Sequence, residues 1–132
     1  MGAERGAYPD VTRNAVERLV TWVLVAGFAL GTATHTLQLV SRGWVVFAAA
    51  PVWMNIYWTV LTFLDPLAAL LLIRARRAGL SLALAIMVSD VAVNSYALYG
   101  LGLPFAVWAL QLRTLFFGFL LGAAGFLWRQ AQ

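Results

Sequence analysis

Apolar residues dominate four long stretches of the chain, and short polar or glycine-containing breaks separate these stretches. A transmembrane helix needs about 20 consecutive, predominantly apolar residues. Each stretch meets this length, so the pattern predicts four transmembrane helices. Their approximate bounds are residues 19–40, 52–73, 80–99 and 105–128.

The breaks between the stretches predict how the helices are arranged. They are Ser41-Arg42-Gly43 with the later Pro51, a charged turn over residues 74–79, and an uncharged turn over residues 100–104. Short connections place consecutive helices side by side in antiparallel directions. We therefore predict an all-α integral membrane protein with one domain over residues 1–132, folded as an up-down-up-down four-helix bundle.

The composition supports a membrane location. Hydrophobic residues make up 63% of the chain and charged residues 11%, whereas a soluble domain has about 45–50% and about 25%. All nine basic residues are arginines that form no continuous stripe, so we expect the lipid bilayer as a partner and no nucleic acid. The chain has no cysteine, which excludes disulfide scaffolds, thiolate metal centres and dithiol redox chemistry.

The arginines are distributed unevenly between the two ends of the predicted bundle. Only Arg42 flanks the end that carries the first and third connections. The arginines at the other end are Arg5, Arg13, Arg18, Arg74, Arg76, Arg77 and Arg129. Cytoplasmic segments of membrane proteins are enriched in basic residues. The distribution therefore predicts that both termini are cytoplasmic.

An aspartate followed by a proline, Asp65-Pro66, lies in the middle of the second stretch. A carboxylate at the bilayer centre costs about 2.5–3.5 kcal/mol on insertion scales, so such residues usually face a bundle interior. Pro66 leaves the carbonyl of Thr62 without its helical donor. Two interpretations remain open: a neutral Asp65 donates to that carbonyl as part of a kink, or Asp65 is a titratable group coupled to a ligand or a movement.

Other polar residues in the stretches fall on shared helix faces. Asn55, Trp58, Thr62 and Asp65 are spaced by 3, 4 and 3 residues, which places them on one side of a helix. Gln111 and Arg113 lie about 200° apart on a helix, so only one can point fully inward. These faces predict a polar pocket open to the external leaflet. Its candidate ligand-binding residues are Asp65, Asp90, Asn94, Arg113, His35, Trp58, Asn55 and Gln111.

Several of these residues also have purely structural interpretations. Asp90 and Arg113 lie at similar depths on adjacent helices, so we expect an ion pair, because buried charges are usually paired. Asn94 and Gln111 are typical of hydrogen bonds between helices. The rise of about 1.5 Å per residue places the single histidine, His35, ~10 Å from the depth of Asp65. One histidine without cysteine supports neither a zinc site nor a bis-histidine haem, so we expect no metal and no cofactor.

Two pairs of glycines have the spacing that lets membrane helices approach closely. They are Gly27 with Gly31 in the first stretch and Gly118 with Gly122 in the fourth. Because the first and last helices of such a bundle are neighbours, the two glycine faces are expected to meet within the chain. The alternative is that either face contacts a second copy or another subunit of a membrane complex.

Three functions are compatible with the sequence. The one we favour is binding or transport of a small or lipid-like molecule in the polar pocket. The second is a membrane enzyme that uses Asp65 in proton-transfer chemistry, which requires two titratable groups within ~5–6 Å of each other. The third is an accessory subunit of a larger complex, which predicts lipid-facing glycine pairs and a fully paired interior.

Overall fold

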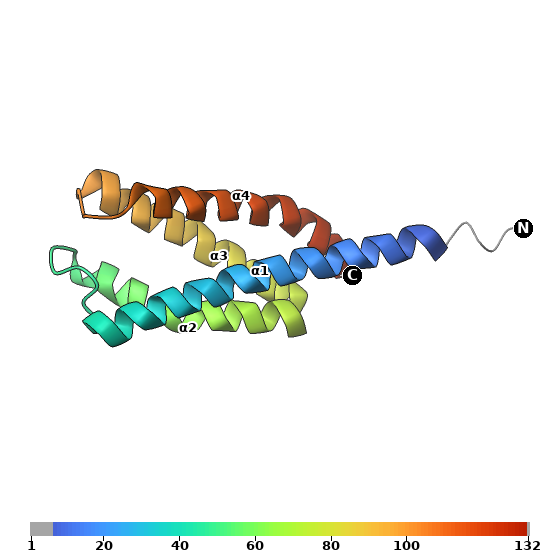
Figure 1. The fold of residues 1–132 in the computed structure, drawn as a ribbon, viewed down its shortest axis with the longest axis horizontal. Helices are drawn as coiled ribbons and strands as arrows, with labels where there is room; N and C mark the ends of the chain where they lie inside the picture. The colour runs from blue at the N-terminus through green and yellow to red at the C-terminus, as the bar shows by residue number, and fades with distance from the viewer. Residues whose placement is uncertain (1–6, 132) are drawn as a thin grey trace, which may run out of the picture.

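The computed structural model describes residues 7–131, and its main elements are four long helices (Figure 1). In chain order the elements are α1 (Ala7–Arg42), α2 (Val52–Arg74), α3 (Arg76–Ser95) with the π-helical turn η1 (Tyr96–Gly100), and α4 (Val107–Gln130). The predicted all-α four-helix bundle is confirmed. Each helix is long and apolar enough to cross a membrane. The chain is thus a small multi-pass integral membrane protein.

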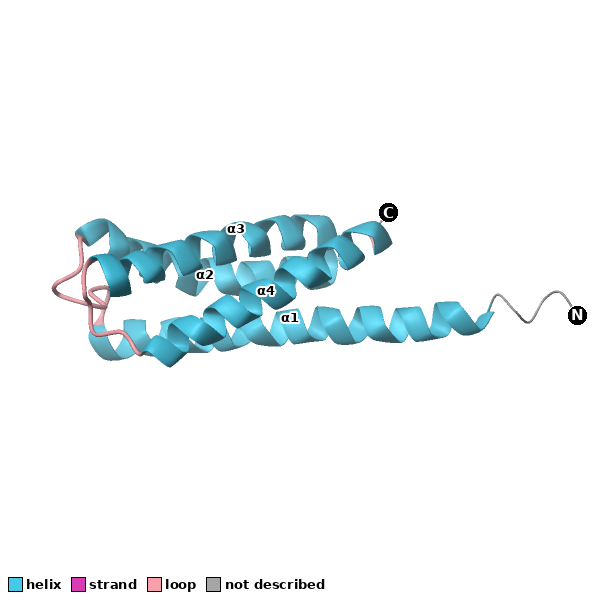
Figure 2. Cartoon of the chain, turned by 90° about the horizontal axis from the view of Figure 1, so that it is seen from above, coloured by secondary structure: helices cyan, strands magenta, loops and turns pink. Residues whose placement is uncertain are grey.

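Consecutive helices pack side by side, so α2 contacts α1 and α3, and α3 contacts α4. The fourth side of the bundle is different, because α1 crosses obliquely and touches α4 only sparsely (Figures 1 and 2). One such contact joins the rings of Phe28 and Phe116, whose centroids are 5.7 Å apart. The bundle is therefore closed on three sides and loosely closed on the fourth.

Helix α1 extends well beyond the predicted first stretch toward the N-terminus (Figure 2). Its 36 residues span roughly 54 Å at the usual helical rise, whereas the hydrocarbon core is about 30 Å thick. Glu17 in the extended part forms an ion pair with Arg76 at the start of α3. This pair anchors the extension of α1 to the remainder of the bundle.

Helices α2 and α3 are joined more tightly than predicted. A single residue, Ala75, links them with φ −141° and ψ 76°, so α3 begins at Arg76 and not near residue 80. The close approach depends on Gly79: a Cβ at this position would lie 2.6 Å from the carbonyl carbon of Leu71. A glycine is required because no side chain fits between the two backbones.

The connection between α1 and α2 folds over the end of the bundle. Phe47 packs its ring against Trp58 of α2 and Phe105 before α4, with centroids 5.7 and 4.8 Å away. Asn55 on α2 holds this connection by hydrogen bonds to Val46 and Phe47. Aromatic packing therefore covers this end of the molecule.

The opposite end carries most of the charge. The N-terminal part of α1, the α2–α3 link and the C-terminus lie at this end (Figure 1). Its described arginines are Arg13, Arg18, Arg74, Arg76, Arg77 and Arg129. Arg5, which also entered the predicted charge distribution, lies outside the described residues.

Candidate functional site

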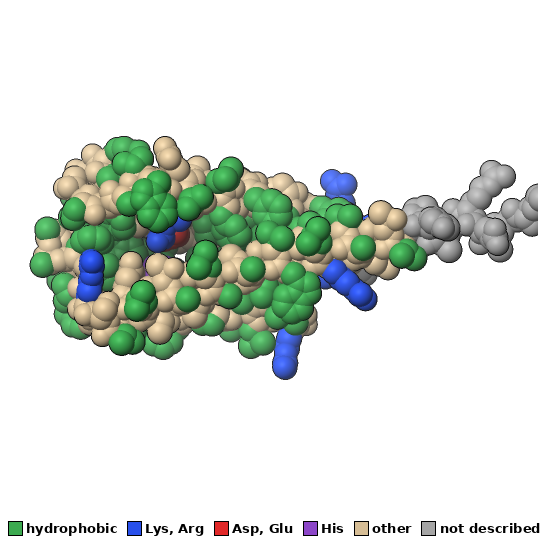
Figure 3. Space-filling view, viewed as in Figure 1, with side chains coloured by type: hydrophobic (Ala, Val, Ile, Leu, Met, Phe, Trp, Pro, Cys, Tyr) green, Lys and Arg blue, Asp and Glu red, His purple; other side chains and the backbone are tan. Residues whose placement is uncertain are grey.

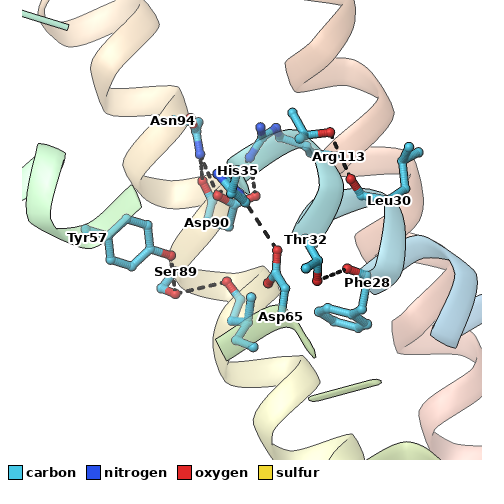
Figure 4. A network of polar contacts seen from close by, with 12 residues as sticks. Phe28, Leu30, Thr32, His35, Tyr57, Asp65, Ser89, Asp90, Asn94 and Arg113 are labelled. Atoms are coloured by element: carbon cyan, nitrogen blue, oxygen red, sulfur yellow. Dashed lines mark hydrogen bonds and ion pairs between the residues drawn. The ribbon is translucent and has the colours of Figure 1, made fainter. Parts of the chain in front are cut away.

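Each of the four helices contributes one ionisable side chain to a polar cluster inside the bundle (Figure 4). The members of this four-helix cluster are His35 from α1, Asp65 from α2, Asp90 from α3 and Arg113 from α4. His35, Asp65 and Asp90 are each only 5% exposed. The cluster therefore holds two carboxyl groups, one guanidinium and one imidazole within an apolar bundle.

Asp90 and Arg113 form the ion pair that joins α3 to α4. Nη1 of Arg113 donates to both carboxylate oxygens of Asp90, at 2.9 and 2.7 Å. Asn94 Nδ2 donates to Oδ1 of the same carboxylate at 2.7 Å. The expected pairing of Asp90 with Arg113 is confirmed. Asn94, however, acts within α3 and not between helices, because its amide orients the carboxylate for Arg113.

His35 and Asp65 meet across the boundary between α1 and α2. His35 Nε2 lies 3.8 Å from Asp65 Oδ2, so the predicted separation of ~10 Å in depth is wrong. The helical rise gives a residue's depth only for a straight helix that runs parallel to its neighbours. In the structure α1 crosses the bundle obliquely (Figure 1), and both side chains reach into the space between the helices (Figure 4).

Asp65 has a notably incomplete set of partners. Its only polar contact among the described residues is the one to His35, at a distance too long for a hydrogen bond. No hydrogen bond from Asp65 to the carbonyl of Thr62 is formed in the described part of the chain, so the kink interpretation has no geometric support. Gly31 gives the carboxyl group room, because a Cβ there would lie 2.6 Å from Asp65 Oδ2.

Several buried polar atoms around the cluster make no hydrogen bond. They are Nδ1 of His35, Oδ1 of Asn94 and Oγ1 of Thr62, which lies one turn before Asp65 on α2. Buried polar groups are almost always hydrogen-bonded to protein or water. The interior is therefore not fully paired. The unpaired atoms belong to His35, which lies beside Asp65, to Thr62, one turn before Asp65, and to Asn94, which contacts Asp90.

A hollow between α1 and α4 leads to the cluster. The space-filling view shows side chains of both charges at the floor of this hollow (Figure 3). Arg113 is the most exposed member, with 24% of its side chain accessible. Beyond the contact of Phe28 with Phe116, α1 and α4 diverge (Figure 1). The cluster can thus be reached from the side of the bundle that α1 closes only loosely.

Three predicted site residues lie outside the cluster. Asn55 holds the α1–α2 connection, and Trp58 packs in the aromatic group at the bundle end. Gln111 is exposed on the outer surface of α4, and Arg113 is the member of that pair that points inward. Asn55 has a structural role, because its side-chain amide forms hydrogen bonds with the backbone of the α1–α2 connection.

One polar contact near the cluster was not predicted. The hydroxyl groups of Tyr57 on α2 and Ser89 on α3 lie 2.6 Å apart (Figure 4). Each residue neighbours a predicted polar face, but no spacing in the sequence links the two helices at this level. Only the packing of α2 on α3 shows that the pair exists.

Among the described residues, no three histidine, cysteine, aspartate or glutamate side chains come together as a group that could hold a metal ion. No family model, curated protein or solved structure matches the chain. A function for this protein is therefore inferred from the geometry of the four-helix cluster and of the hollow above it.

Proposed function

We propose that the protein binds or transports a small amphiphilic or lipid-like molecule, and that this molecule occupies the hollow between α1 and α4. The observation that carries the proposal is the four-helix cluster beneath this hollow (Figures 3 and 4). Burying ionisable groups in a membrane is costly, and such groups usually line functional sites. The unpaired atoms of His35, Asn94 and Thr62 add unused hydrogen-bonding capacity.

The position of the hollow defines a route for the ligand. Because α1 touches α4 sparsely, an acyl chain can pass between them without leaving the bilayer while a polar group reaches the cluster. By the distribution of arginines, the open end belongs to the external leaflet. A lateral entrance of this kind suits an amphiphile better than a fully hydrated solute.

The test uses photoreactive amphiphiles and the full chain in phosphatidylcholine nanodiscs. Three probes share one long alkyl chain with a diazirine and differ in the headgroup, which is a primary amine, an alcohol or a carboxylate. We expect at least one probe to label α1 and α4 saturably around the hollow. Labelled peptides are identified by mass spectrometry.

Two substitutions on α4 form a matched pair for this experiment. Ala109 is half-buried and lies one turn before Arg113, whereas Gln111 is exposed on the outer surface. Ala109→Phe is expected to reduce labelling to background, because the ring narrows the route to the cluster, and Gln111→Phe is expected to preserve it. Unsaturable labelling by all three probes, or equal labelling of both variants, would reject the proposal.

A second candidate is a membrane enzyme that performs proton-transfer chemistry. It is favoured by the approach of His35 Nε2 to Asp65 Oδ2 at 3.8 Å, a separation at which two titratable groups interact strongly. Mass spectrometry of a probe that carries a carbon–carbon double bond, recovered from D₂O, distinguishes the candidates, because the π bond supplies the electron pair that accepts a proton. A binding protein returns the probe unchanged, whereas proton transfer to carbon introduces deuterium that the Asp65→Asn variant does not introduce.

The third possibility, an accessory subunit, has less support. Its expected fully paired interior is not found, since several buried atoms near the cluster lack partners. Gly27 faces Phe116 and Gly31 faces Asp65, so this glycine pair serves contacts within the chain. Gly118 and Gly122 have nothing within 4 Å of an added Cβ. A homodimer or partner contact through the α4 pair stays a proposal.

A further inference from the structure

We infer that the polar end of the ligand is a protonated amine with N–H donors, and that Asp65 is the group that receives it. This inference rests on the proposed function and names the chemistry of its ligand. It follows from how the charges of the four-helix cluster are already distributed between its members.

Asp90 does not need a further cation. Its carboxylate accepts two hydrogen bonds from Arg113 and one from Asn94, which satisfies most of its capacity as an acceptor. Arg113 is the single guanidinium of the cluster, and its charge is balanced by Asp90. The second carboxyl group of the cluster therefore has no arginine available to it.

Among the described residues, Asp65 has no arginine partner and accepts no hydrogen bond. It is 5% exposed, and His35 at 3.8 Å is its only polar contact in the described structure. A buried carboxylate is tolerated when it is paired and hydrogen-bonded. An ammonium group provides one positive charge and up to three donors, so it supplies both of the missing contributions.

Unpaired acceptors on the Asp65 face of α2 and beside Asp90 favour the same ligand. Oδ1 of Asn94 and Oγ1 of Thr62 are buried and make no hydrogen bond. Both can accept an N–H, and Thr62 shares the face of α2 that carries Asp65. A primary ammonium has enough donors to serve the carboxylate and a second acceptor at once, whereas a quaternary ammonium has none.

An anionic headgroup fits the cluster less well. It would have to approach Arg113, the cluster's only guanidinium, whose charge Asp90 already balances. With an anionic headgroup, the site would hold three acidic groups, which are Asp65, Asp90 and the headgroup, against the single guanidinium of Arg113. Burying unbalanced like charges in a membrane is unfavourable, so the charge distribution selects a cation.

The test is a competition in the wild-type protein with the probes described above. Dodecylamine, dodecyltrimethylammonium, dodecanol and dodecanoate compete for labelling of the full chain in phosphatidylcholine nanodiscs. We expect dodecylamine to compete about tenfold or more better than the other three, because a hydrogen bond to a charged group contributes about 1.5–3 kcal/mol. Dodecyltrimethylammonium carries the same charge, so it separates N–H donation from simple attraction of cations to the membrane.

The variant Asp65→Asn provides an independent measurement. It keeps the shape of the side chain and removes its charge, so we expect the advantage of dodecylamine over dodecanol to disappear while the protein keeps its elution volume and helical content. Equal competition by amine and alcohol, or stronger competition by the carboxylate, would overturn the amine inference and leave the binding pocket itself intact. Saturable labelling by no probe would instead reject the proposed function.

Discussion

The side chain of Asn55 supplies hydrogen bonds that the backbone of the α1–α2 connection cannot form within itself. Its Oδ1 accepts the N–H groups of Val46 and Phe47 at 2.8 and 3.0 Å, and its Nδ2 donates to the carbonyl of Phe47 at 3.0 Å. Asn55 is 3% exposed. One buried amide therefore determines how the connection covers the end of the bundle.

Replacing this amide should loosen the connection and lower stability. Asn55→Ala leaves the N–H groups of Val46 and Phe47 without acceptors, so we expect the free energy of unfolding to fall by about 1–3 kcal/mol. Equilibrium unfolding in mixed micelles measures the change. Gln111→Ala, at an exposed position, is the control and should leave stability unaltered. An equal effect of the two substitutions would contradict the role assigned to Asn55.

The residue scale also shows where prediction from sequence succeeds and fails. The Asp90–Arg113 pair was predictable, because opposite charges at similar depths on adjacent helices have few other partners. The approach of His35 to Asp65 was not, since it depends on the oblique path of α1 and on side-chain reach. The role of Asn55 was equally hidden, because its partners lie in an irregular connection whose path no periodic pattern specifies.

At the scale of the helices, the glycines divide into those that a neighbour covers and those that face outward. Gly79 lies against the backbone of α2, and Gly27 lies against the ring of Phe116. Gly118 and Gly122 have open space beside them. The spacing of small residues predicts close approach, yet it does not reveal which helix approaches. The expected meeting of the two glycine pairs is therefore not formed in the structure.

Gly79 and Gly122 make a matched pair for testing this division. Gly79→Ala places a methyl group 2.6 Å from the carbonyl carbon of Leu71 and 2.7 Å from Cα of Leu72. These are backbone atoms that cannot rotate away, so we expect a loss of about 1–3 kcal/mol. Gly122→Ala meets no atom within 4 Å and should cost nothing in the monomer. Melting temperatures of the two variants in one detergent measure the difference.

The helix bounds were predictable to the extent that apolar runs define them. All four spans were found, because crossing a bilayer requires an apolar length that composition reveals directly. The predicted and observed bounds differ most at the start of α1 and the start of α3. Both starts lie in polar sequence. There a helix continues for reasons that hydropathy does not measure, including the ion pair of Glu17 with Arg76.

At the scale of the whole molecule, the hollow and most of the described arginines lie toward opposite ends. The hollow lies between α1 and α4 toward the end that carries the α1–α2 connection (Figure 3). The described arginines other than Arg42 and Arg113 lie at the end that carries the termini (Figure 1). If basic residues remain in the cytoplasm, the hollow opens to the external leaflet. The leaflet to which the hollow opens therefore depends on the orientation of the chain.

Orientation can be measured cleanly because the chain contains no cysteine. Ser41 and Ala78 are both exposed and lie at opposite ends of the bundle. In intact cells, a membrane-impermeant maleimide is expected to label Ser41→Cys, whereas Ala78→Cys should react only after the membrane is opened. Moving an arginine-rich segment across a bilayer is unfavourable, which is the physical reason for the expected difference. The reverse labelling pattern would place the hollow in the cytoplasmic leaflet, and equal labelling of both variants would mean that the chain inserts in both directions.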